Sequence, residues 1–456
     1  MATRKEKSQA KVEREKQERL QQNQLKAEQF SLEKAFTYTN MYQALKDCRK
    51  GVWWKGSVQS YYNNAVIEIH NTIQCISQHK LPEFTSNYKM YIYERGKKRT
   101  ITPITIKDRI VQRVICDHIL LPAIEKSLIY DNGASLKNKG VDFSRQRTLK
   151  LLEAAKHKYG NDFYVLKFDF KSYFDSIPHW VCRDVLLKYV HNEETVNFIM
   201  EIIKSYKLAD INQIEDEKER QSQIEKLNNL ELCGICLGSQ ISQILALVVP
   251  NEIDHYIKDV LGIKFYSRYM DDGTIFSDDK DFLRKVYGEM ENLAAQKGLA
   301  FSKAKTHIIK VSDGFTFLKV RYAITSSGKI VRKLDRSGIV RMRRNLKKYY
   351  NKVKNGEMTL DDVYNSMQSW IAHAEIAESY KDVQQMLKLY DTLFGGYKLT
   401  AVYFQESKRG HRLSKKCIKQ RKKNKKKRLK RNSVNISQKQ SINNKVKEEH
   451  RWITLI

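Results

Sequence analysis

The stretch that decides the fold spans residues 267–276 and reads Ser-Arg-Tyr-Met-Asp-Asp-Gly-Thr-Ile-Phe. Apolar-rich segments flank it at 263–266 and 274–276, so Asp271 and Asp272 fall at a tight break between two strands. The Asp-Gly step is a strong hairpin signal, which predicts a hairpin whose tip carries both acids. Adjacent carboxylates repel each other unless a cation lies between them, which favours a divalent metal. The sequence Asp-Asp-Gly also occurs in ordinary surface turns, so this stretch alone does not distinguish a metal site from a surface turn.

Two segments upstream carry further chemistry in a fixed order. Segment 164–179 starts with strand-like apolar residues, reaches Asp169 and continues into the aromatic pair Tyr173-Phe174. A lone Asp at a strand end usually caps a helix or lies in a turn. Segment 234–243 reads Gly-Ile-Cys-Leu-Gly-Ser-Gln-Ile-Ser-Gln, a glycine-bearing turn that opens into an apolar helix. The chain therefore presents one Asp, then a glycine turn, then the paired Asp.

In this order the three segments resemble the palm motifs of reverse transcriptases, which are RNA-directed DNA polymerases. Downstream, Lys305 resembles the lysine of the family's fourth motif, and 315–318 resembles its primer-grip hairpin. The resemblance covers residues 35–395 and points to bacterial and phage-type enzymes, in particular those of diversity-generating retroelements and of antiphage defence. It implies an α+β right-hand polymerase fold, with fingers, a palm built on an antiparallel sheet, and a helical thumb.

The composition of successive segments divides the chain along the same lines. Residues 1–34 are charged and helix-prone but too poor in apolar residues for a buried face, so they predict a solvated arm, helical or disordered. The other expected segments are an N-terminal helical extension at 35–85, fingers at 86–160, a palm at 161–335 with a charged insertion at 206–232 and a primer-grip region at 312–333, a helical thumb at 336–400, and a basic tail at 401–456.

The resemblance implies two-metal nucleotidyl transfer at the palm. Asp169 and Asp271 are expected to bind two Mg²⁺ ions, for which Mn²⁺ is an expected substitute, with Asp272 as a supporting carboxylate. The backbone carbonyl of Phe170 is expected to complete one ion's shell, on the resemblance alone.

The same resemblance places dNTP-binding residues in the fingers and the palm. Phe174 is expected either to exclude a ribose 2′-hydroxyl or to be a core residue. An arginine fork suits triphosphate oxygens better than a lone ammonium, which ranks Arg99 before Lys98. Further residues expected near the dNTP are Gly238, Gln243 and Lys305, and those expected near the template backbone are Lys139 and Gly140.

The net charge of +32 independently points to a nucleic-acid partner. Residues 408–431 contain 15 Lys and Arg and no acidic residue. Such an excess binds phosphates through counterion release and makes affinity depend on salt. This stretch is also compatible with a nuclear signal or a solubility tail. Attached to a polymerase, it is expected to bind RNA, with Lys422, Lys423, Lys426 and Arg428 as its representative contacts.

Several signals are missing from the sequence. Its apolar runs are shorter than a membrane span, and the N-terminus has no secretory apolar core, so a cytoplasmic protein without membrane contact is expected. Cys233 and Cys236 form a Cys-x-x-Cys pair without a second pair at zinc spacing, which favours reduced thiols. Trp53 and Trp54 are compatible with base stacking or with core packing.

The expected partners are an RNA template, a DNA product and dNTPs. The template is expected to be a dedicated structured non-coding RNA, and an accessory protein or a homo-oligomer stays open. Two alternatives also remain. The palm chemistry is equally compatible with protein-primed or untemplated DNA synthesis. A non-catalytic RNA-binding maturase or scaffold would be expected to have lost carboxylates, whereas Asp169, Asp271 and Asp272 are all present.

Overall fold

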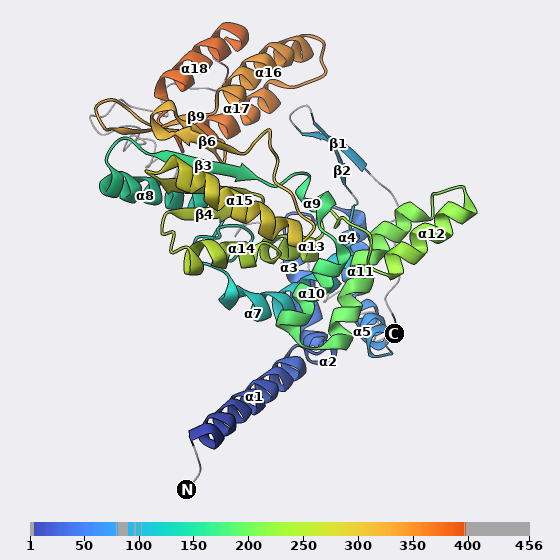
Figure 1. Ribbon diagram of the computed structural model, residues 1–456. Coiled ribbons are helices and arrows are strands. Elements are labelled where there is room, and N and C mark those ends of the chain that lie inside the picture. The colour runs from blue at the N-terminus through green and yellow to red at the C-terminus, as the bar shows by residue number, and fades with distance from the viewer. Residues whose placement is uncertain are drawn as a thin grey trace, which may run out of the picture. The chain divides into compact units, whose positions relative to one another are not determined.

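The computed structural model describes residues 4–78, 80, 90–94, 97–101, 103–395 and 397, with the backbone alone for 4–12, 94 and 97–100. The chain divides into two compact units, Met1–Phe315 and Thr316–Ile456. Helices and antiparallel strands make up both units, which agrees with the predicted α+β class (Figure 1). Each unit is described below by itself.

A four-stranded antiparallel sheet organises the first unit. Its strand order is β4-β5-β3-β6, with bounds Tyr266–Tyr269, Asp272–Ser277, Tyr164–Asp169 and His307–Lys310. Val165, Leu166 and Phe168 of the central strand β3 are all buried, because helices pack on the sheet. The helix α8 (Val141–Tyr159) packs on β4 and β5, and α15 (Lys280–Gln296) packs on β3, β5 and β6. The charged ends of β3 and β5 thus emerge from an apolar centre.

Ser239 caps the apolar helix α13 (Gln240–Val248) through its hydroxyl, and α13 packs among other helices of this unit. The helix α6 (Ile106–Ile115) packs on α13 and on α3 (Tyr38–Cys48). The other helical segments are α1 (Arg4–Gln29), α2 (Leu32–Ala35), α4 (Gly56–Asn63), α5 (Ala65–Ser77), η1 (Cys116–Leu120), α7 (Leu121–Ile124), η2 (Glu125–Ser127), α9 (Tyr173–Ser176), α10 (His179–Val190), α11 (Glu193–Ile211), α12 (Glu217–Asn228), α14 (Asn251–His255), η3 (Tyr256–Val260) and η4 (Val311–Asp313).

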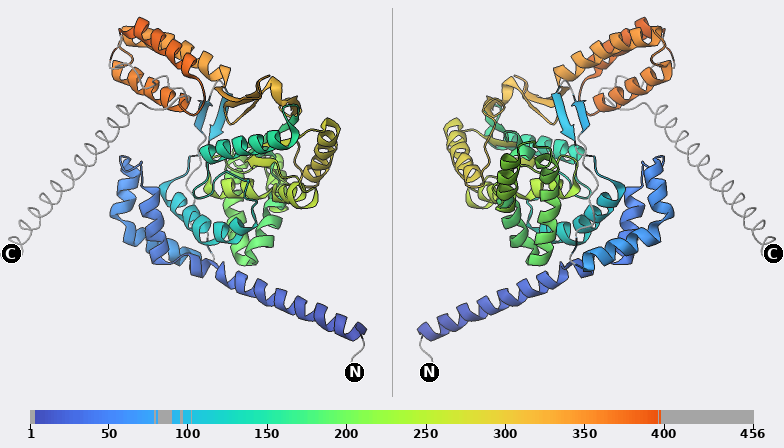
Figure 2. Two further views of the ribbon diagram at one scale, coloured as in Figure 1. Left: turned by 90° about the vertical axis from the view of Figure 1, so that its left-hand side faces the viewer. Right: turned by 90° about the vertical axis from the view of Figure 1, so that its right-hand side faces the viewer.

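The expected charged segments of the first unit form helices. Most of the expected arm is the long helix α1 (Figure 2), and α2 begins within its last residues. The end of α1 is tied down where Asn192 Nδ2 donates to the carbonyl of Ala27, and Thr195 Oγ1 donates to the carbonyl of Phe30 just beyond it. The expected insertion at 206–232 comprises the end of α11 and the solvated helix α12. The basic hairpin expected in the fingers is β1 (Met90–Glu94) paired with β2 (Lys97–Ile101).

The second unit combines a small antiparallel sheet with three helices. The strands β7 (Phe315–Phe317), β8 (Val320–Ile324) and β9 (Ile330–Leu334) follow one another in the sheet, so the expected primer-grip stretch forms a hairpin. The helices α16 (Arg336–Lys354), α17 (Leu360–Ala374) and α18 (Tyr380–Phe394) pack on one another through buried residues at helical spacing, such as Val363, Met367 and Ile371. The expected basic tail lies outside the described residues. In the described ranges, no helix has both the length and the apolar character needed to cross a membrane.

Candidate active site

Three acidic residues meet at one end of the sheet in the first unit. Asp169 is the last residue of β3 and pairs across the sheet with Asp272, the first residue of β5. Asp272 also pairs with Tyr269, so Met270 and Asp271 alone form the turn that joins β4 to β5. Because Asp271 immediately precedes the Asp272 that faces Asp169, the fold brings all three predicted carboxylates to the same strand ends.

The hairpin carries both acids at its tip, as predicted. Its turn consists of Met270 and Asp271, whereas Asp272 and Gly273, the step that signalled the hairpin, are the first two residues of β5. Met270 adopts the positive φ of 54° that such a two-residue turn requires. Gly273 faces Phe168, and a Cβ at this glycine would lie 2.1 Å from the ring of Phe168. The glycine is therefore needed for close packing beneath the acids.

Asp272 lies in an environment that disfavours its charge. Burial, together with the nearby carboxylates of Asp271 and Asp169, raises the pKa of Asp272 from 3.8 to about 7, although Lys167 acts in the opposite direction. The Lys167 ammonium is 3.9 Å from Asp272 Oδ1. That oxygen is buried and accepts no hydrogen bond from the described part of the chain. A cation bound between these acids would offset both the burial of the Asp272 charge and its repulsion by Asp271 and Asp169.

Lys305 provides a positive charge beside the acids. Its ammonium donates to Asp169 Oδ1 at 2.6 Å, while half of the lysine side chain stays exposed. Partial burial lowers the pKa of Lys305, but the hydrogen bond to Asp169 and the charges of the three acids outweigh it and raise the pKa. The predicted lysine of the fourth motif is thus brought to the carboxylates.

The acids form an incomplete set of metal ligands, which suits Mg²⁺. In the described residues, no three His, Cys, Asp or Glu side chains converge in a geometry that would enclose a metal ion. Mg²⁺ is usually held by one or two carboxylates together with water and substrate phosphates, so such an enclosure is not needed. The buried oxygen of Asp272, which accepts no hydrogen bond from the described residues, and the neighbouring carboxylates supply oxygen donors of the required kind. The residues present therefore fit the predicted cofactor.

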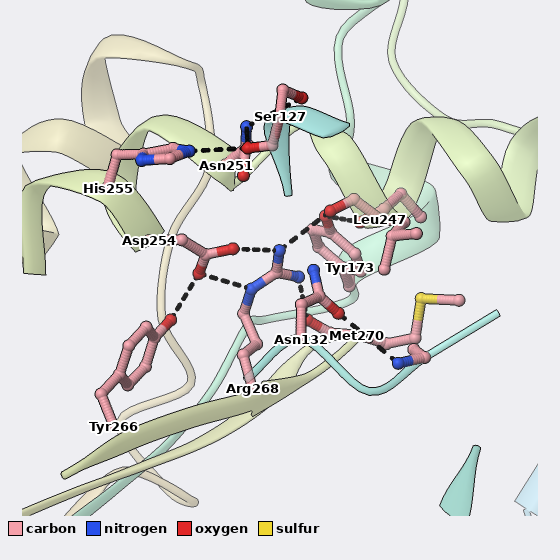
Figure 3. Close-up of polar contacts among 12 residues, drawn as sticks. Ser127, Asn132, Tyr173, Leu247, Asn251, Asp254, His255, Tyr266, Arg268 and Met270 are labelled. Atoms are coloured by element: carbon pink, nitrogen blue, oxygen red, sulfur yellow. Dashed lines mark hydrogen bonds and ion pairs between the residues drawn. The ribbon is translucent and has the colours of Figure 1, made fainter. Parts of the chain in front are cut away.

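A buried ion pair supports the hairpin, as Figure 3 shows. Arg268 of β4 and Asp254 of α14 have side chains that are 1% and 0% exposed, and their closest atoms, Nη2 and Oδ2, are 2.6 Å apart. Asp254 Oδ1 also accepts hydrogen bonds from Arg268 Nε at 2.8 Å and from the Tyr266 hydroxyl at 2.5 Å. Arg268 then donates to the carbonyls of Met270 and Leu247 at 2.8 and 2.9 Å. The guanidinium thus binds the turn that carries Asp271.

The loop before α8 pairs with the same strand. The amide of Arg268 donates to the carbonyl of Asp131, and the amide of Gly133 donates to the carbonyl of Arg268. Lys139, an expected template contact, donates to the carbonyls of Tyr130 and Asn132 at 2.9 Å. Its ammonium therefore stabilises this loop. Gly140, the other expected template residue, precedes α8 with a φ of 146°, and its Cβ position is open.

Gln112 of α6 holds the glycine turn of the palm. This buried side chain accepts hydrogen bonds through Oε1 from the Ser239 hydroxyl at 2.9 Å and from the Gln240 amide at 3.1 Å, and it donates to Tyr206. Sequence reasoning missed Gln112, although a Gln within the apolar run of α6 signals a buried hydrogen-bond partner. Gly238 has a φ of 112°, which favours glycine. Gly238 and Gln243 line a polar cavity of about 170 Å³, as do Arg109 and Arg113.

An aromatic cluster surrounds the junction after β3. Phe170 stacks on Phe301 with ring centroids 4.4 Å apart and on Tyr173 at 5.1 Å. The amide of Phe170 donates to the carbonyl of Asp271, which ties β3 to the hairpin turn. Phe174 is half-buried and meets Tyr173 edge to face at 6.0 Å. Its ring is thus partly supported by the core and partly exposed.

Several predicted site residues lie where their side chains are not described. Lys98 and Arg99 belong to β2, where their backbones pair with Tyr93 and Ile92. The tail residues Lys422, Lys423, Lys426 and Arg428 lie outside the described residues, and their role stays a prediction.

Comparison with known proteins identifies the family. The sequence profile described as reverse transcriptase (RNA-dependent DNA polymerase) matches residues 86–322. No curated protein matches. Two solved structures of apo telomerase from Candida tropicalis are similar, each with 14% identity. The form truncated from its C-terminal domain gives a TM-score of 0.35 and a coverage of 56% of each chain. The other gives a TM-score of 0.37, covering 73% of this chain and 64% of the telomerase chain.

The matched residues make up slightly more than half of the chain, so the chain belongs to the reverse transcriptase family. The matched domain is that of an RNA-directed DNA polymerase, a class of nucleotidyltransferases, and it contains Asp169, Asp271 and Asp272. The predicted family and the predicted polymerase fold are thereby confirmed. The chain spans less than two thirds of the length of the two telomerase chains.

Proposed function

We propose that this chain adds dNTPs to a primer 3′-hydroxyl at the carboxylates of Asp169, Asp271 and Asp272, copying RNA into DNA. The observation that carries the proposal is the convergence of these acids at one end of the sheet, with Asp272 half-buried and its pKa raised to about 7. Self-repulsion of this kind is costly unless a cation binds, and perturbed carboxylates of this kind concentrate at catalytic sites.

The residues around the acids divide the remaining work. Two bound Mg²⁺ ions supply the activation of the primer hydroxyl and the neutralisation of the triphosphate. Asp169 and Asp271 hold them, while Asp272 and the carbonyl of Phe170 complete the oxygen donors. Lys305, half-exposed at 2.6 Å from Asp169, offers its charge to the incoming triphosphate.

Selection of the nucleotide falls to a second group of residues. The half-exposed ring of Phe174 excludes a ribose 2′-hydroxyl by contact, which favours dNTPs over rNTPs. The turn at Gly238, held by Gln112, allows close approach of the incoming base, and both Gly238 and Gln243 border a polar cavity. Lys98 and Arg99 of the fingers hairpin bind the triphosphate.

The template is a dedicated structured non-coding RNA, and the enzyme acts in antiphage defence or in a diversity-generating retroelement. The net charge of +32 supports a nucleic acid that is bound over many phosphates. The two biological settings differ in their genomic neighbourhood. A template repeat with a variable repeat marks diversification, and a cluster of defence genes marks immunity.

Primer extension on a defined RNA template tests the proposal. Asp271→Asn should lower the rate of DNA synthesis about a thousandfold or more, because ligands of the catalytic ions contribute several kcal/mol. Its affinity for RNA should stay unchanged. The matched control is Asp278→Asn, an exposed acid that follows the opposite end of β5, and it should synthesise DNA like the wild type. Wild-type synthesis by Asp271→Asn would exclude this carboxylate as a metal ligand.

A further inference from the structure

The helix α3 presents an unusual outer face. It buries Met41, Leu45 and Cys48 against its neighbours, with α6 as its main contact. A stripe that flanks this buried face, at positions four, four and three residues apart, consists of aromatic and basic residues, namely Tyr38, Tyr42, Lys46 and Arg49. A solvated helix face normally carries mixed charges without rings. Figure 2 shows the blue helices α3–α5 beside the teal helix α6.

Two neighbouring tryptophans extend this face and are not core residues. The side chains of Trp53 and Trp54 are 43% and 75% exposed, which excludes core packing for Trp54. Tryptophan is a highly buried residue on average, so such exposure in an adjacent pair calls for a partner. The Trp53 ring meets the Tyr62 ring edge to face at 5.0 Å. Its backbone carbonyl accepts a hydrogen bond from Gln59 at 2.9 Å, so the loop that presents both rings is held in place.

Cations lie directly over these rings. The Arg49 guanidinium is 5.3 Å from the centre of the Trp53 ring and 4.7 Å from that of Tyr62. The Lys55 ammonium is 5.4 Å from the centre of the Trp54 ring. Residues 38–63 contain four basic residues and one acid, Asp47, which pairs with Lys50 at 2.5 Å. The surface thus combines ring faces with uncompensated positive charge, which matches a partner with both flat bases and phosphates.

The helix α3 also borders the polar cavity beside the glycine turn. The polar cavity bordered by Gly238 and Gln243 of the palm is closed on another side by Asp47 and Cys48 at the end of α3. Arg109, whose carbonyl accepts a hydrogen bond from the Cys48 thiol, also lines it. One turn of α3 therefore borders the palm cavity and directly precedes Arg49.

We propose that the aromatic surface, formed by Tyr42, Arg49, Trp53, Trp54, Lys55 and Tyr62, binds single-stranded nucleic acid by stacking unpaired bases on its rings. During synthesis it holds the unpaired part of the template, a second statement that rests on the proposed function. Stacking on an aromatic ring is available to every base and is lost in a duplex, so the surface selects single strands without reading sequence.

Binding of a 20-nucleotide oligouridylate to the full-length protein tests the first statement. Binding should be measured at about 0.3 M salt. At this concentration the contacts of the basic tail with phosphates weaken, whereas the stacking of bases on aromatic rings persists. Trp54→Ala should weaken binding about tenfold or more, and Trp54→Phe should restore most of it because a ring is retained. The matched control is Trp180→Ala, which removes a tryptophan of similar exposure (40%) from α10 and should bind like the wild type.

Further arms separate the partners that could cover this surface. Binding of the matching oligodeoxyuridylate should depend on Trp54 as binding of the RNA does. Binding of a blunt RNA duplex should not depend on Trp54. Arg49→Gln should reduce the salt dependence of single-strand binding by about one phosphate contact. Equal affinities of wild type and Trp54→Ala for the single strand would overturn the proposal. It would also be overturned if Trp54→Ala lost as much affinity for the duplex as for the single strand.

Template length distinguishes this inference from the proposed function. With a one-nucleotide template overhang, Trp54→Ala should extend a primer like the wild type. With a 15-nucleotide overhang, its KM for the template should rise about tenfold at unchanged kcat. Equal KM values on the long overhang would overturn the template role while leaving polymerase activity intact. Absence of synthesis by the wild type would refute the proposed function and leave the binding results standing.

Discussion

Two arginines of the first unit show what burial does to a charge. Arg268 is 1% exposed, and its guanidinium makes four hydrogen bonds, to Asp254, Met270 and Leu247. Arg49 lies partly exposed over two aromatic rings on the outer face of α3. The buried arginine is committed to the geometry of the hairpin that carries Asp271. The partly exposed one keeps its guanidinium over the Trp53 and Tyr62 rings, where solvent reaches it.

The largest effect is expected from breaking the buried pair. Arg268→Met leaves Asp254 buried without its partner and should lower the free energy of unfolding by about 3–5 kcal/mol. Loss of the bond to the Met270 carbonyl should also stop DNA synthesis. Urea unfolding of the full chain measures the first effect, and primer extension measures the second.

An exposed ion pair provides the matched control. Lys188 and Glu252 are 2.9 Å apart, and about half of each side chain is exposed. Lys188→Met should therefore cost less than about 1 kcal/mol. Similar losses in Arg268→Met and Lys188→Met would contradict the role given to burial.

Asp272 makes the stability of the metal-free protein depend on pH. Its pKa is about 7 in the folded chain against 3.8 ordinarily, so the folded state holds a proton that the unfolded state has lost. The resulting destabilisation is negligible below about pH 4, grows as pH rises and is complete above about pH 7. Asp272→Asn should thus stabilise the protein at pH 8, by about 2–4 kcal/mol, and leave it unchanged at pH 4.

Thermal unfolding in a chelator, compared with unfolding in Mg²⁺, measures this effect. Mg²⁺ should stabilise the wild type more at pH 8 than at pH 5, because its ligands must be ionised. Identical pH profiles of stability for wild type and Asp272→Asn would show that folding does not raise the pKa of Asp272.

Close packing beneath the acids is tested by a pair of glycines. Gly273→Ala would place a Cβ 2.1 Å from the Phe168 ring and should cost about 1–3 kcal/mol, with slower synthesis because the strand ends shift. Gly288 lies inside α15, and its Cβ position has no atom within 4 Å. Gly288→Ala should therefore stabilise by about 0.5–1 kcal/mol. The two substitutions should change the free energy of unfolding in opposite directions in one denaturation series. Changes in the same direction would argue against close packing of Gly273 on Phe168.

The smallest effect on synthesis is expected at Phe174, whose side chain is half-buried. Phe174→Ala should raise rNTP incorporation relative to dNTP about tenfold, a difference of about 1.4 kcal/mol between the two substrates. Single-nucleotide incorporation on an RNA template gives this ratio. An unchanged ratio with lower thermal stability would make Phe174 a core residue.

The sequence revealed the acids but not what holds them. Asp169, Asp271 and Asp272 could be predicted because their motifs are local and occur in order. Asp254 is 14 residues before Arg268 and resembles any helix-surface acid, so only the packing of α14 on the sheet reveals their pair. Asp-Gly signals a turn locally, whereas Gly273 lies within β5 and is required there by the ring of Phe168, about a hundred residues away.

The nucleic acid that copurifies with the protein tests the central claim most directly. Wild type and Asp271→Asn should be isolated from the native host and their bound nucleic acids sequenced in parallel. A single structured RNA is expected with both proteins, and complementary DNA with the wild type alone. DNA without an RNA complement would indicate untemplated synthesis, and RNA without DNA from either protein would contradict RNA-directed DNA synthesis at these three carboxylates.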